Sequence, residues 1–217
     1  MISTGIKKLD NFLGGGIKNG IITDIFGSTG TGKTQLAMQI TINSLLQGGQ
    51  ALFQDTTGQF RPERMLEMIK NRNLEQNMLD RVKVGRITNA SEQIQYLSKI
   101  KESDFSLIVI DNVTDLFSFE YDKVEQNLEK NVTFMEYMHK LSFISIEKKI
   151  PIIVTNIIRE IDELEKENLV NPISIFTHIK IKLVKRESKY FGEILPSFLQ
   201  KREFEYKITK DGLVDSS

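Results

Sequence analysis

The stretch that decides the fold is residues 27–34, which read G-S-T-G-T-G-K-T. They fit the pattern G-x-x-x-x-G-K-[S/T], in which glycines let main-chain N–H groups turn inward around phosphate oxygens. Lys33 is then placed to reach the β and γ phosphates, and the Thr34 hydroxyl to bind Mg²⁺. The pattern therefore predicts ATP as a ligand of eight residues: Gly27, Ser28, Thr29, Gly30, Thr31, Gly32, Lys33 and Thr34.

The segments on either side of this loop strengthen the prediction. Residues 21–26 form a short apolar run typical of a strand, and residues 33–47 are typical of a helix that ends at Gly48-Gly49. The alternative is a plain glycine turn between a strand and a helix. We favour phosphate binding, because a helix N-terminus carries a partial positive charge that attracts anions.

Short apolar runs alternate with amphipathic stretches along the rest of the chain, which is typical of repeated β-α units. The pattern predicts an α/β fold with a mostly parallel twisted sheet, flanking helices and antiparallel C-terminal strands. With no internal repeat or linker, we expect one domain over residues 1–217. The further expected strands are residues 51–55, 82–87, 107–110, 152–155, 179–184 and 204–208. Three further helices are expected. One starts at Pro62, one spans residues 90–100, and a long one carries Leu128, Val132, Met135, Met138, Leu141 and Ile144.

Composition narrows the functional classes. The 29 basic residues balance the 29 acidic ones, so any attraction to nucleic acid must come from a local patch. The chain has no cysteine and two histidines, which excludes disulfides and thiolate metal sites and disfavours a zinc site. No run approaches the roughly 20 apolar residues that span a bilayer. We therefore expect a cytoplasmic protein that does not contact membranes.

Asp111 follows the buried run 107–110 and is the candidate magnesium-side carboxylate. An aspartate after a strand also forms turns, which is the alternative role. The phosphate loop favours the first role, since Mg²⁺ in such sites is held by a carboxylate and a hydroxyl together with phosphates. We therefore predict that Thr34 and Asp111 hold the metal.

Four segments carry a resemblance to a known superfamily. Residues 4–16 resemble the lead-in of the RecA/RadA/KaiC superfamily, and residues 55–64, D-T-T-G-Q-F-R-P-E-R, resemble the D-T-E-G-T-F-R-P-E-R segment of RadA-type recombinases. Residues 107–116 resemble their Walker B strand, and residues 154–156 resemble the strand that leads to their second DNA-binding loop. The similarity covers nearly the whole chain, and the F-R-P-E-R segment favours RadA-type relatives over KaiC. The fold that this resemblance implies is a RecA-like P-loop NTPase core.

The resemblance implies ATP and DNA binding, weak hydrolysis, and an accessory role in homologous recombination and DNA repair. It also implies single-stranded DNA and a RadA-type recombinase as partners, a homo-oligomer or dimer, and association with the nucleoid. Recombinases of the family carry an N-terminal helical DNA-binding domain and a linker that donates an aromatic residue. Here the core begins at Met1, so we expect both to be absent, a layout that resembles RadB, the archaeal RadA paralog.

Three positions depart from the family pattern. The glutamate that activates water in the family is Thr57 here, and the position after the Walker B aspartate is Asn112. The glutamine that follows Thr-Asn in the family is Ile157. Asp55 and Asp115 are the remaining carboxylates, but a carboxylate displaced along a strand points elsewhere or lies about 6–7 Å away. We therefore leave the catalytic base unassigned and expect ATP to be held with slow turnover, because a misplaced base forfeits about 10²–10⁴-fold in rate.

Arg61 and Arg64 match family positions that contact or stack on adenine, so the resemblance implies that both bind ATP. Their alternative role is a solvated first turn of a helix. The functional role is the one we favour.

Four residues are candidates for DNA binding. Phe119 and Tyr121 lie in the expected first DNA loop, residues 117–123, and could stack on bases. Lys180 and Lys182 alternate along an expected strand and so share a face, although a basic strand face is more often a solvated edge. Residues 159–171 are acidic, which is unfavourable for DNA and typical of a solvated helix.

Three functional hypotheses remain open at this stage. The first is a RadB-like accessory ATPase of recombination. The second is a non-hydrolysing, nucleotide-gated scaffold, suggested by Thr57, Asn112 and Ile157. The third is a KaiC-like signalling ATPase, suggested by the opening residues 3–6.

Overall fold

A computed structural model describes residues 1–161, 164–195 and 202–216. A sheet of ten strands crosses it in the order β10-β9-β8-β7-β1-β5-β4-β2-β3, and β6 pairs with β5 off this path. The strands are β1 (Ile22–Gly27), β2 (Ala51–Asp55), β3 (Val82–Arg86), β4 (Leu107–Asp111), β5 (Ile152–Ile161), β6 (Leu164–Glu167), β7 (Ile179–Arg186), β8 (Lys189–Leu195), β9 (Glu203–Thr209) and β10 (Gly212–Asp215).

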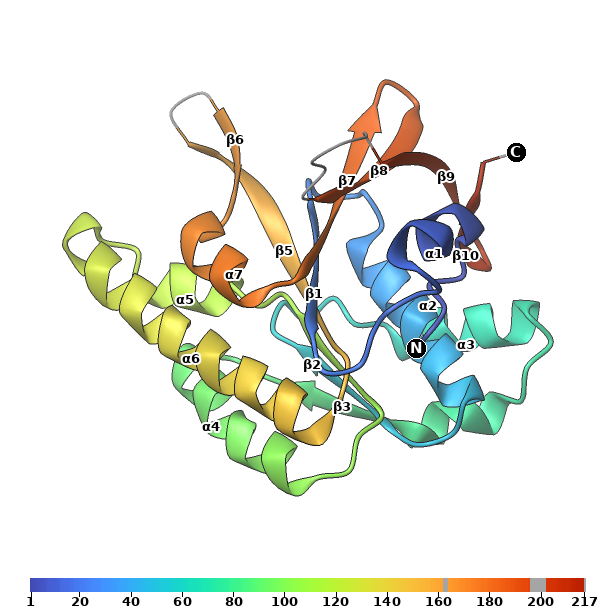
Figure 1. Cartoon of the computed structure of the whole chain (residues 1–217), viewed down its shortest axis with the longest axis horizontal. Helices are drawn as coiled ribbons and strands as arrows, with labels where there is room; N and C mark the ends of the chain where they lie inside the picture. The colour runs from blue at the N-terminus through green and yellow to red at the C-terminus, as the bar shows by residue number, and fades with distance from the viewer. Residues whose placement is uncertain (162–163, 196–201, 217) are drawn as a thin grey trace.

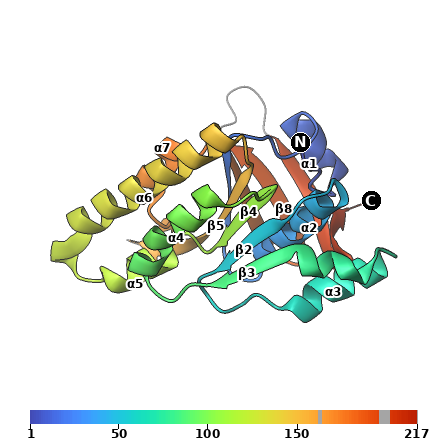
Figure 2. The ribbon, with the colours of Figure 1, turned by 90° about the horizontal axis from the view of Figure 1, so that it is seen from below.

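Helices cover both faces of the sheet. One face carries α1, α2 and α3, and the other carries α4, α5, α6 and α7, as Figures 1 and 2 show. The helices are α1 (Lys7–Leu13), α2 (Lys33–Leu46), α3 (Pro62–Asn71), α4 (Ala90–Glu102), α5 (Asp115–Glu120), α6 (Asn127–Lys148) and α7 (Val170–Phe176), with short 3-10 turns η1 (Gln76–Arg81) and η2 (Val124–Gln126). Among the described residues, no helix combines the length and apolar content that a membrane crossing requires.

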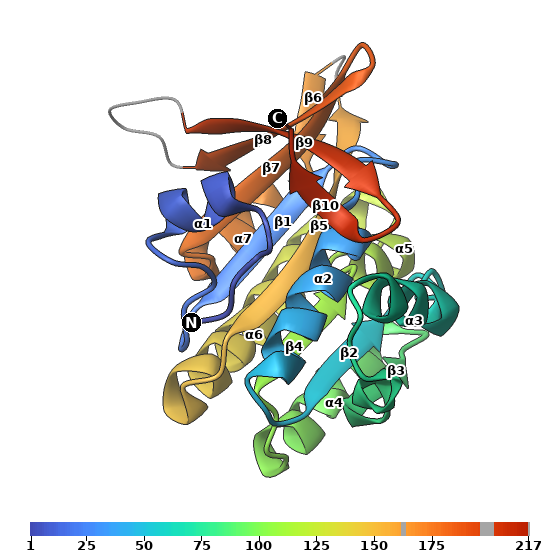
Figure 3. The same cartoon turned by 90° about the vertical axis from the view of Figure 1, so that its right-hand side faces the viewer.

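The central strands are parallel and the C-terminal ones are not. Strands β7, β1, β5, β4, β2 and β3 run parallel, whereas β8, β9 and β10 run antiparallel to their neighbours. Figure 3 shows β8, β9 and β10 extending the sheet beyond β7. The predicted fold class is therefore confirmed.

The side chains of β4 point alternately to the two faces of the sheet, which shows why the sheet is buried on both sides. Leu107 and Val109 pack in the core beneath α1, α2 and α3, while Ile108 and Ile110 pack in the core beneath α4 to α7. All four are fully buried. Successive side chains of a strand point to opposite faces, so an unbroken apolar run serves two cores at once.

Local signals explain several helix ends. Pro62 stands in the first turn of α3, where its missing N–H leaves no bond unmade. The Asn89 side chain accepts a hydrogen bond from the Glu92 amide at the start of α4, and the Thr88 amide donates back to the Glu92 carboxylate. Gly48 follows the end of α2 with a φ of 94°, a left-handed conformation that favours glycine.

Two expectations about the acidic and aromatic loops were wrong. Residues 117–120 of the expected first loop belong to α5, because the Phe117 ring is buried against Phe134 and Tyr137. The acidic segment expected as a solvated helix instead continues β5 to Ile161 and returns as β6. The β-branched residues of β5 favour this hairpin over a helix. Residues 162–163 of that segment lie outside the described residues.

The expected stripe of α6 divides between two faces of the helix. Met138, Leu141 and Ile144 are buried in the core, but Leu128 and Val132 are 76% and 47% exposed. The spacing of the apolar residues correctly predicted a helix, but it did not predict which of these side chains face the core and which face outward.

Candidate nucleotide-binding site

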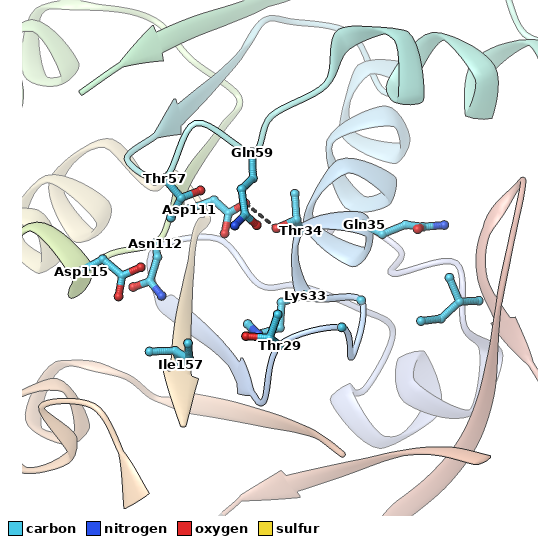
Figure 4. A pocket seen from close by; sticks show the side chains of 13 residues that line it. Thr29, Lys33, Thr34, Gln35, Thr57, Gln59, Asp111, Asn112, Asp115 and Ile157 are labelled. Atoms are coloured by element: carbon cyan, nitrogen blue, oxygen red, sulfur yellow. Dashed lines mark hydrogen bonds between the residues drawn. The ribbon is translucent and has the colours of Figure 1, made fainter. Parts of the chain in front are cut away.

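The candidate site lies at the carboxyl edge of the parallel strands, where ligands of open α/β sheets bind. The loop between β1 and α2 meets the ends of β2 and β4, since Asp55 and Asp111 are paired in register. They enclose a cavity of about 380 Å³, shown in Figure 4 and lined by Thr29, Gly30, Gly32, Lys33, Thr34, Gln35, Thr57, Gln59, Asp111, Asn112, Asp115, Ile157 and Ile208.

Two positions in the loop need glycine for different reasons. A Cβ on Gly27 would lie 2.1 Å from the Leu183 carbonyl oxygen of the adjacent strand β7. Gly32 precedes α2 with a φ of 90°, in the left-handed region that other residues adopt at a cost. The loop backbone is thus held in the turned shape that phosphate binding needs.

The Lys33 side chain is folded over the loop. Its Nζ donates hydrogen bonds to the Gly27 and Ser28 carbonyl oxygens, both at 2.9 Å. Burial lowers the pKa of Lys33, and the carboxylates of Asp111 and Asp115 oppose that shift. The ammonium therefore stands at the cavity wall as a partly desolvated donor suited to an anion.

Thr34 and Asp111 meet across the floor of the cavity. The Thr34 hydroxyl donates to Asp111 Oδ2 at 2.6 Å, drawn as a dashed line in Figure 4. The Thr155 hydroxyl from β5 donates to Oδ1 of the same carboxylate. Burial raises the pKa of Asp111, although these two hydrogen bonds act in the opposite direction. A cation near the carboxylate would favour its charged form.

This pair of oxygen ligands fits Mg²⁺. The ion prefers octahedral oxygen ligands and usually keeps several waters, using one or two protein groups together with phosphates. Among the described residues, no three His, Cys, Asp or Glu side chains cluster as a metal site. The hydroxyl of Thr34 and the carboxylate of Asp111 therefore suit a metal that arrives with a nucleotide.

Side chains near the expected position of the γ phosphate include few carboxylates. Thr57, Asn112 and Ile157 line the cavity, as does Asp115, which also lies 3.5 Å from Arg159. Asp55 has a structural role instead. Its carboxylate accepts hydrogen bonds from the amides of residues 57–60 and lies 3.4 Å from Arg86. Of the two remaining carboxylates, only Asp115 faces the cavity.

The other end of the cavity is formed by residues that the sequence did not single out. Gln35 and Ile208 line it, and the Gln35 amide donates to the Thr209 carbonyl. The Tyr206 hydroxyl of β9 donates to the Thr31 carbonyl of the loop at 2.6 Å. No motif marks these residues, because the contact between β9 and the loop spans most of the chain.

Arg61 and Arg64 lie beside the cavity rather than on its lining. Arg64 donates to the Thr209 carbonyl at 2.6 Å and also pairs with Glu67. Arg61 donates to the carbonyls of Gly58 and Phe60. Their contact with adenine stays a prediction that no observation here tests.

The four candidate DNA residues occupy different environments. Phe119 is 82% exposed, and Tyr121 is partly buried at the end of α5. Lys180 and Lys182 do share a face, but β7 pairs with both β1 and β8, so this strand is not an edge. Lys180 is largely buried and pairs with Asp24 at 3.2 Å and Glu167 at 2.5 Å. These ion pairs compete with any phosphate and argue against a DNA contact for Lys180.

Comparison with known proteins agrees with the architecture. A family model described as Rad51 matches residues 1–216. DNA repair and recombination protein RadB of Thermococcus onnurineus is 38% identical over 160 residues, which cover 72% of this chain and 68% of that protein. The RadB proteins of Thermococcus sibiricus and Pyrococcus furiosus are 31% and 29% identical, covering 99% of this chain and 95% and 96% of theirs.

The match to the family model extends over the phosphate loop, the Asp111 strand and the C-terminal strands alike. The residues that motivated the resemblance are therefore part of a similarity that spans the chain. On this basis, the chain belongs to the Rad51 family of RecA/RadA-like proteins.

Proposed function

We propose that this chain binds ATP with Mg²⁺ through residues 27–34 and acts as an accessory factor in homologous recombination and DNA repair. The family implies nucleotide binding with Mg²⁺ in general. The observation that carries the proposal for this chain is the 2.6 Å hydrogen bond from Thr34 to Asp111 beneath the glycine loop. It brings a metal-binding hydroxyl and a carboxylate to one point beside Lys33, as the joint binding of phosphate and Mg²⁺ requires.

The repair role is supported by relatives. Proteins named DNA repair and recombination protein RadB align with nearly all of this chain. Single-stranded DNA and a RadA-type recombinase are the partners that this role implies, and a place at the nucleoid belongs to the same proposal. The match to the Rad51 model gives no support to a KaiC-like role, which we do not propose.

Holding ATP is the better-supported part of the activity. When bound, Mg²⁺ would neutralise phosphate charge and polarise the transferred group. The chain itself supplies Lys33 as a donor but has Thr57 and Asn112 where a water-activating carboxylate would stand. Asp115 lines the same cavity and is the candidate residual base. We propose slow turnover of ATP. The second candidate function, which Thr57 and Asn112 also favour, is a non-hydrolysing scaffold that is gated by the nucleotide.

Direct DNA binding is proposed at the aromatic positions rather than at Lys180. Phe119 is exposed on α5, where a base could stack on its ring. The acidic hairpin of β5 and β6 carries Glu165, Lys166 and Glu167, so it offers little attraction to phosphates. We therefore expect weak binding with a small dependence on salt. A single RecA-like core domain over residues 1–217 completes the proposal.

ATP turnover measured alone, with single-stranded DNA, and with a RadA-type recombinase tests these alternatives. An accessory ATPase should turn over slowly and bind DNA or the recombinase in an ATP-dependent way. Failure to associate with either at low salt would overturn the recombination role. A rate in the usual enzyme range of about 1–10³ s⁻¹ would overturn the scaffold alternative.

A further inference from the structure

Helix α6 carries two apolar faces, and only one of them is used by the fold. The face toward the sheet is buried and holds Phe134, Tyr137, Met138, Leu141 and Ile144. The opposite face, here called the outer stripe, consists of Leu128, Val132, Met135, His139, Phe143 and Ile146.

The outer stripe is continuous along the helix. Each residue advances an α-helix by about 100°, so these six positions fall within a sector of about 80°. The exposed fractions of Leu128, Phe143 and Ile146 are 76%, 56% and 59%. Single exposed apolar side chains are ordinary, but a connected stripe about 27 Å long marks an interaction surface. A groove of about 250 Å³ between α4 and α6, lined in part by His139 and Phe143, adjoins it.

The spacing of the stripe is nearly the same when read in either direction. Starting at Leu128, the steps are four, three, four, four and three residues. An antiparallel second copy would therefore place Leu128 opposite Ile146, and Met135 opposite His139, about a two-fold axis near the middle of the helix. Steps of three and four residues are the pattern of helices that pair in coiled coils, and the stripe departs from strict alternation once, at the two steps of four between Met135 and Phe143.

Charges beside the stripe favour the same orientation. Residues 125–136 carry Glu125, Glu129, Lys130 and Glu136, a net charge of −2, and residues 137–149 carry Lys140, Glu147, Lys148 and Lys149, a net charge of +2. All of these side chains except Lys130 and Lys148 are exposed, and Glu147 pairs with Lys101 of α4. Antiparallel pairing brings the acidic half of one copy against the basic half of the other, whereas parallel pairing would oppose like charges.

One pair of charges lies close to the axis. Glu136 and Lys140 flank the stripe on the same side, so the two-fold operation places Glu136 beside Lys140 of the second copy, twice per dimer. Neither side chain forms an ion pair within the part of the chain that the structure describes. Both are therefore available for pairing between copies.

We propose that the outer stripe of α6 binds a second copy of this chain, forming an antiparallel two-fold dimer. Such a contact is isologous, since the same patch serves both partners, and it closes without building a filament. A pair of helices buries less than the roughly 800 Å² per partner of a standard interface, so the dimer should be reversible. The proposal does not depend on nucleotide binding.

Sedimentation of the full chain over a range of concentrations tests the association. The mass should rise from 24.9 kDa toward twice that value, with and without ATP. Met135→Glu should raise the dissociation constant by at least about tenfold, because it puts a charge into the apolar contact and removes apolar area. Leu46→Glu, at an exposed apolar position at the end of α2, is the matched control and should leave the constant unchanged. Circular dichroism should show that both variants stay folded.

A charge exchange tests the orientation. Glu136→Lys and Lys140→Glu should each weaken self-association at low salt, by about five- to tenfold, because like charges then meet at both contacts. A mixture of the two variants should associate like the unaltered chain, since each contact then joins a lysine of one copy to a glutamate of the other. Only pairing between two chains produces this rescue.

Four results would overturn the proposal. The chain could stay monomeric at all concentrations, Met135→Glu could dimerise like the control, or the mixture could show no rescue. Binding of a recombinase to this face with no self-association would also overturn it.

Discussion

Lys33→Met should remove most of the stabilisation that ATP gives to this protein without lowering the stability of the ligand-free chain. Lys33 Nζ lies 2.9 Å from two loop carbonyls and faces the cavity. Methionine keeps the apolar part of the side chain and removes the charge. The variant therefore isolates the contribution of the ammonium group.

The expected size follows from the contacts that Lys33 would make. Two charge-assisted hydrogen bonds to phosphate oxygens contribute at least about 3 kcal/mol together, and about 1.4 kcal/mol corresponds to a tenfold change in affinity. The variant should thus bind ATP about 100-fold more weakly. At ATP equal to 100 times the original dissociation constant, the unaltered chain gains about 2.7 kcal/mol and the variant about 0.4 kcal/mol.

These free energies convert into melting temperatures. A domain of this size shifts by about 2–4 °C per kcal/mol, so ATP should raise Tm by about 5–11 °C in the unaltered chain and about 1–2 °C in the variant. Without ATP, the variant should melt close to the temperature of the unaltered chain. Burial lowers the pKa of Lys33, so its charge costs stability in the folded state, and removing this cost offsets the loss of the two hydrogen bonds to the loop carbonyls.

Scanning calorimetry with and without Mg²⁺ and ATP, together with titration calorimetry for the dissociation constant, checks both parts. Lys18→Met is the matched control, an exposed lysine outside the cavity, and should keep the full shift. A Lys33→Met variant that retained more than half of the ATP-induced shift would refute the proposed role of the loop. A large loss of ligand-free stability would refute the argument from burial.

Three further substitutions test the nucleotide-binding site and the buried ion pairs of Lys180. Thr57→Glu restores a carboxylate at the cavity wall and should raise ATP turnover by about 10²-fold; an unchanged rate would show that this position is not what limits hydrolysis. Asp111→Asn should remove the Mg²⁺ dependence of ATP binding in titration calorimetry. Burial raises the pKa of Asp111, so the unaltered chain should lose stability as the pH rises from below the ordinary value of 3.8 through the raised pKa. Asp111→Asn should lose less stability over the same pH range, as measured by melting curves. Lys180→Met should lower the free energy of unfolding by about 3–5 kcal/mol in urea, because it leaves Asp24 and Glu167 without their cation. Lys182→Met is the control and should leave the free energy of unfolding nearly unchanged. Small and equal effects of the two substitutions would contradict the buried ion-pair role of Lys180.

Local signals were sufficient to predict the architecture of the sheet. The unbroken β-branched run of β4 and the alternation of strands with helices predicted parallel strands buried on both faces, and the structure confirms them. The same logic predicted that Asp111 would approach Thr34, since carboxyl ends of adjacent parallel strands share an edge. The role of these residues as ligands of ATP and Mg²⁺ stays a prediction.

Contacts between distant segments could not be read from local patterns. Phe117 was expected in a loop, yet its ring is buried by α6 and draws its segment into a helix. Lys180 was expected on a basic face, yet Asp24 and Glu167 from two other strands enclose it. In both cases, the deciding partner lies on a segment that periodicity does not connect to the residue.

The sequence by itself determined which runs are strands and predicted residues 27–34 as a phosphate-binding loop, because both depend on residue type and short-range spacing. That Thr57 stands in place of a catalytic glutamate is a prediction from the resemblance to the family. Only the tertiary structure decided that Asp55 closes a turn while Asp115 faces the cavity, and that Tyr206 braces the loop at Thr31. It also decided that α6 buries one of its two apolar faces and leaves the other exposed. The physical reason is that burial and pairing depend on what the folded chain brings alongside each side chain.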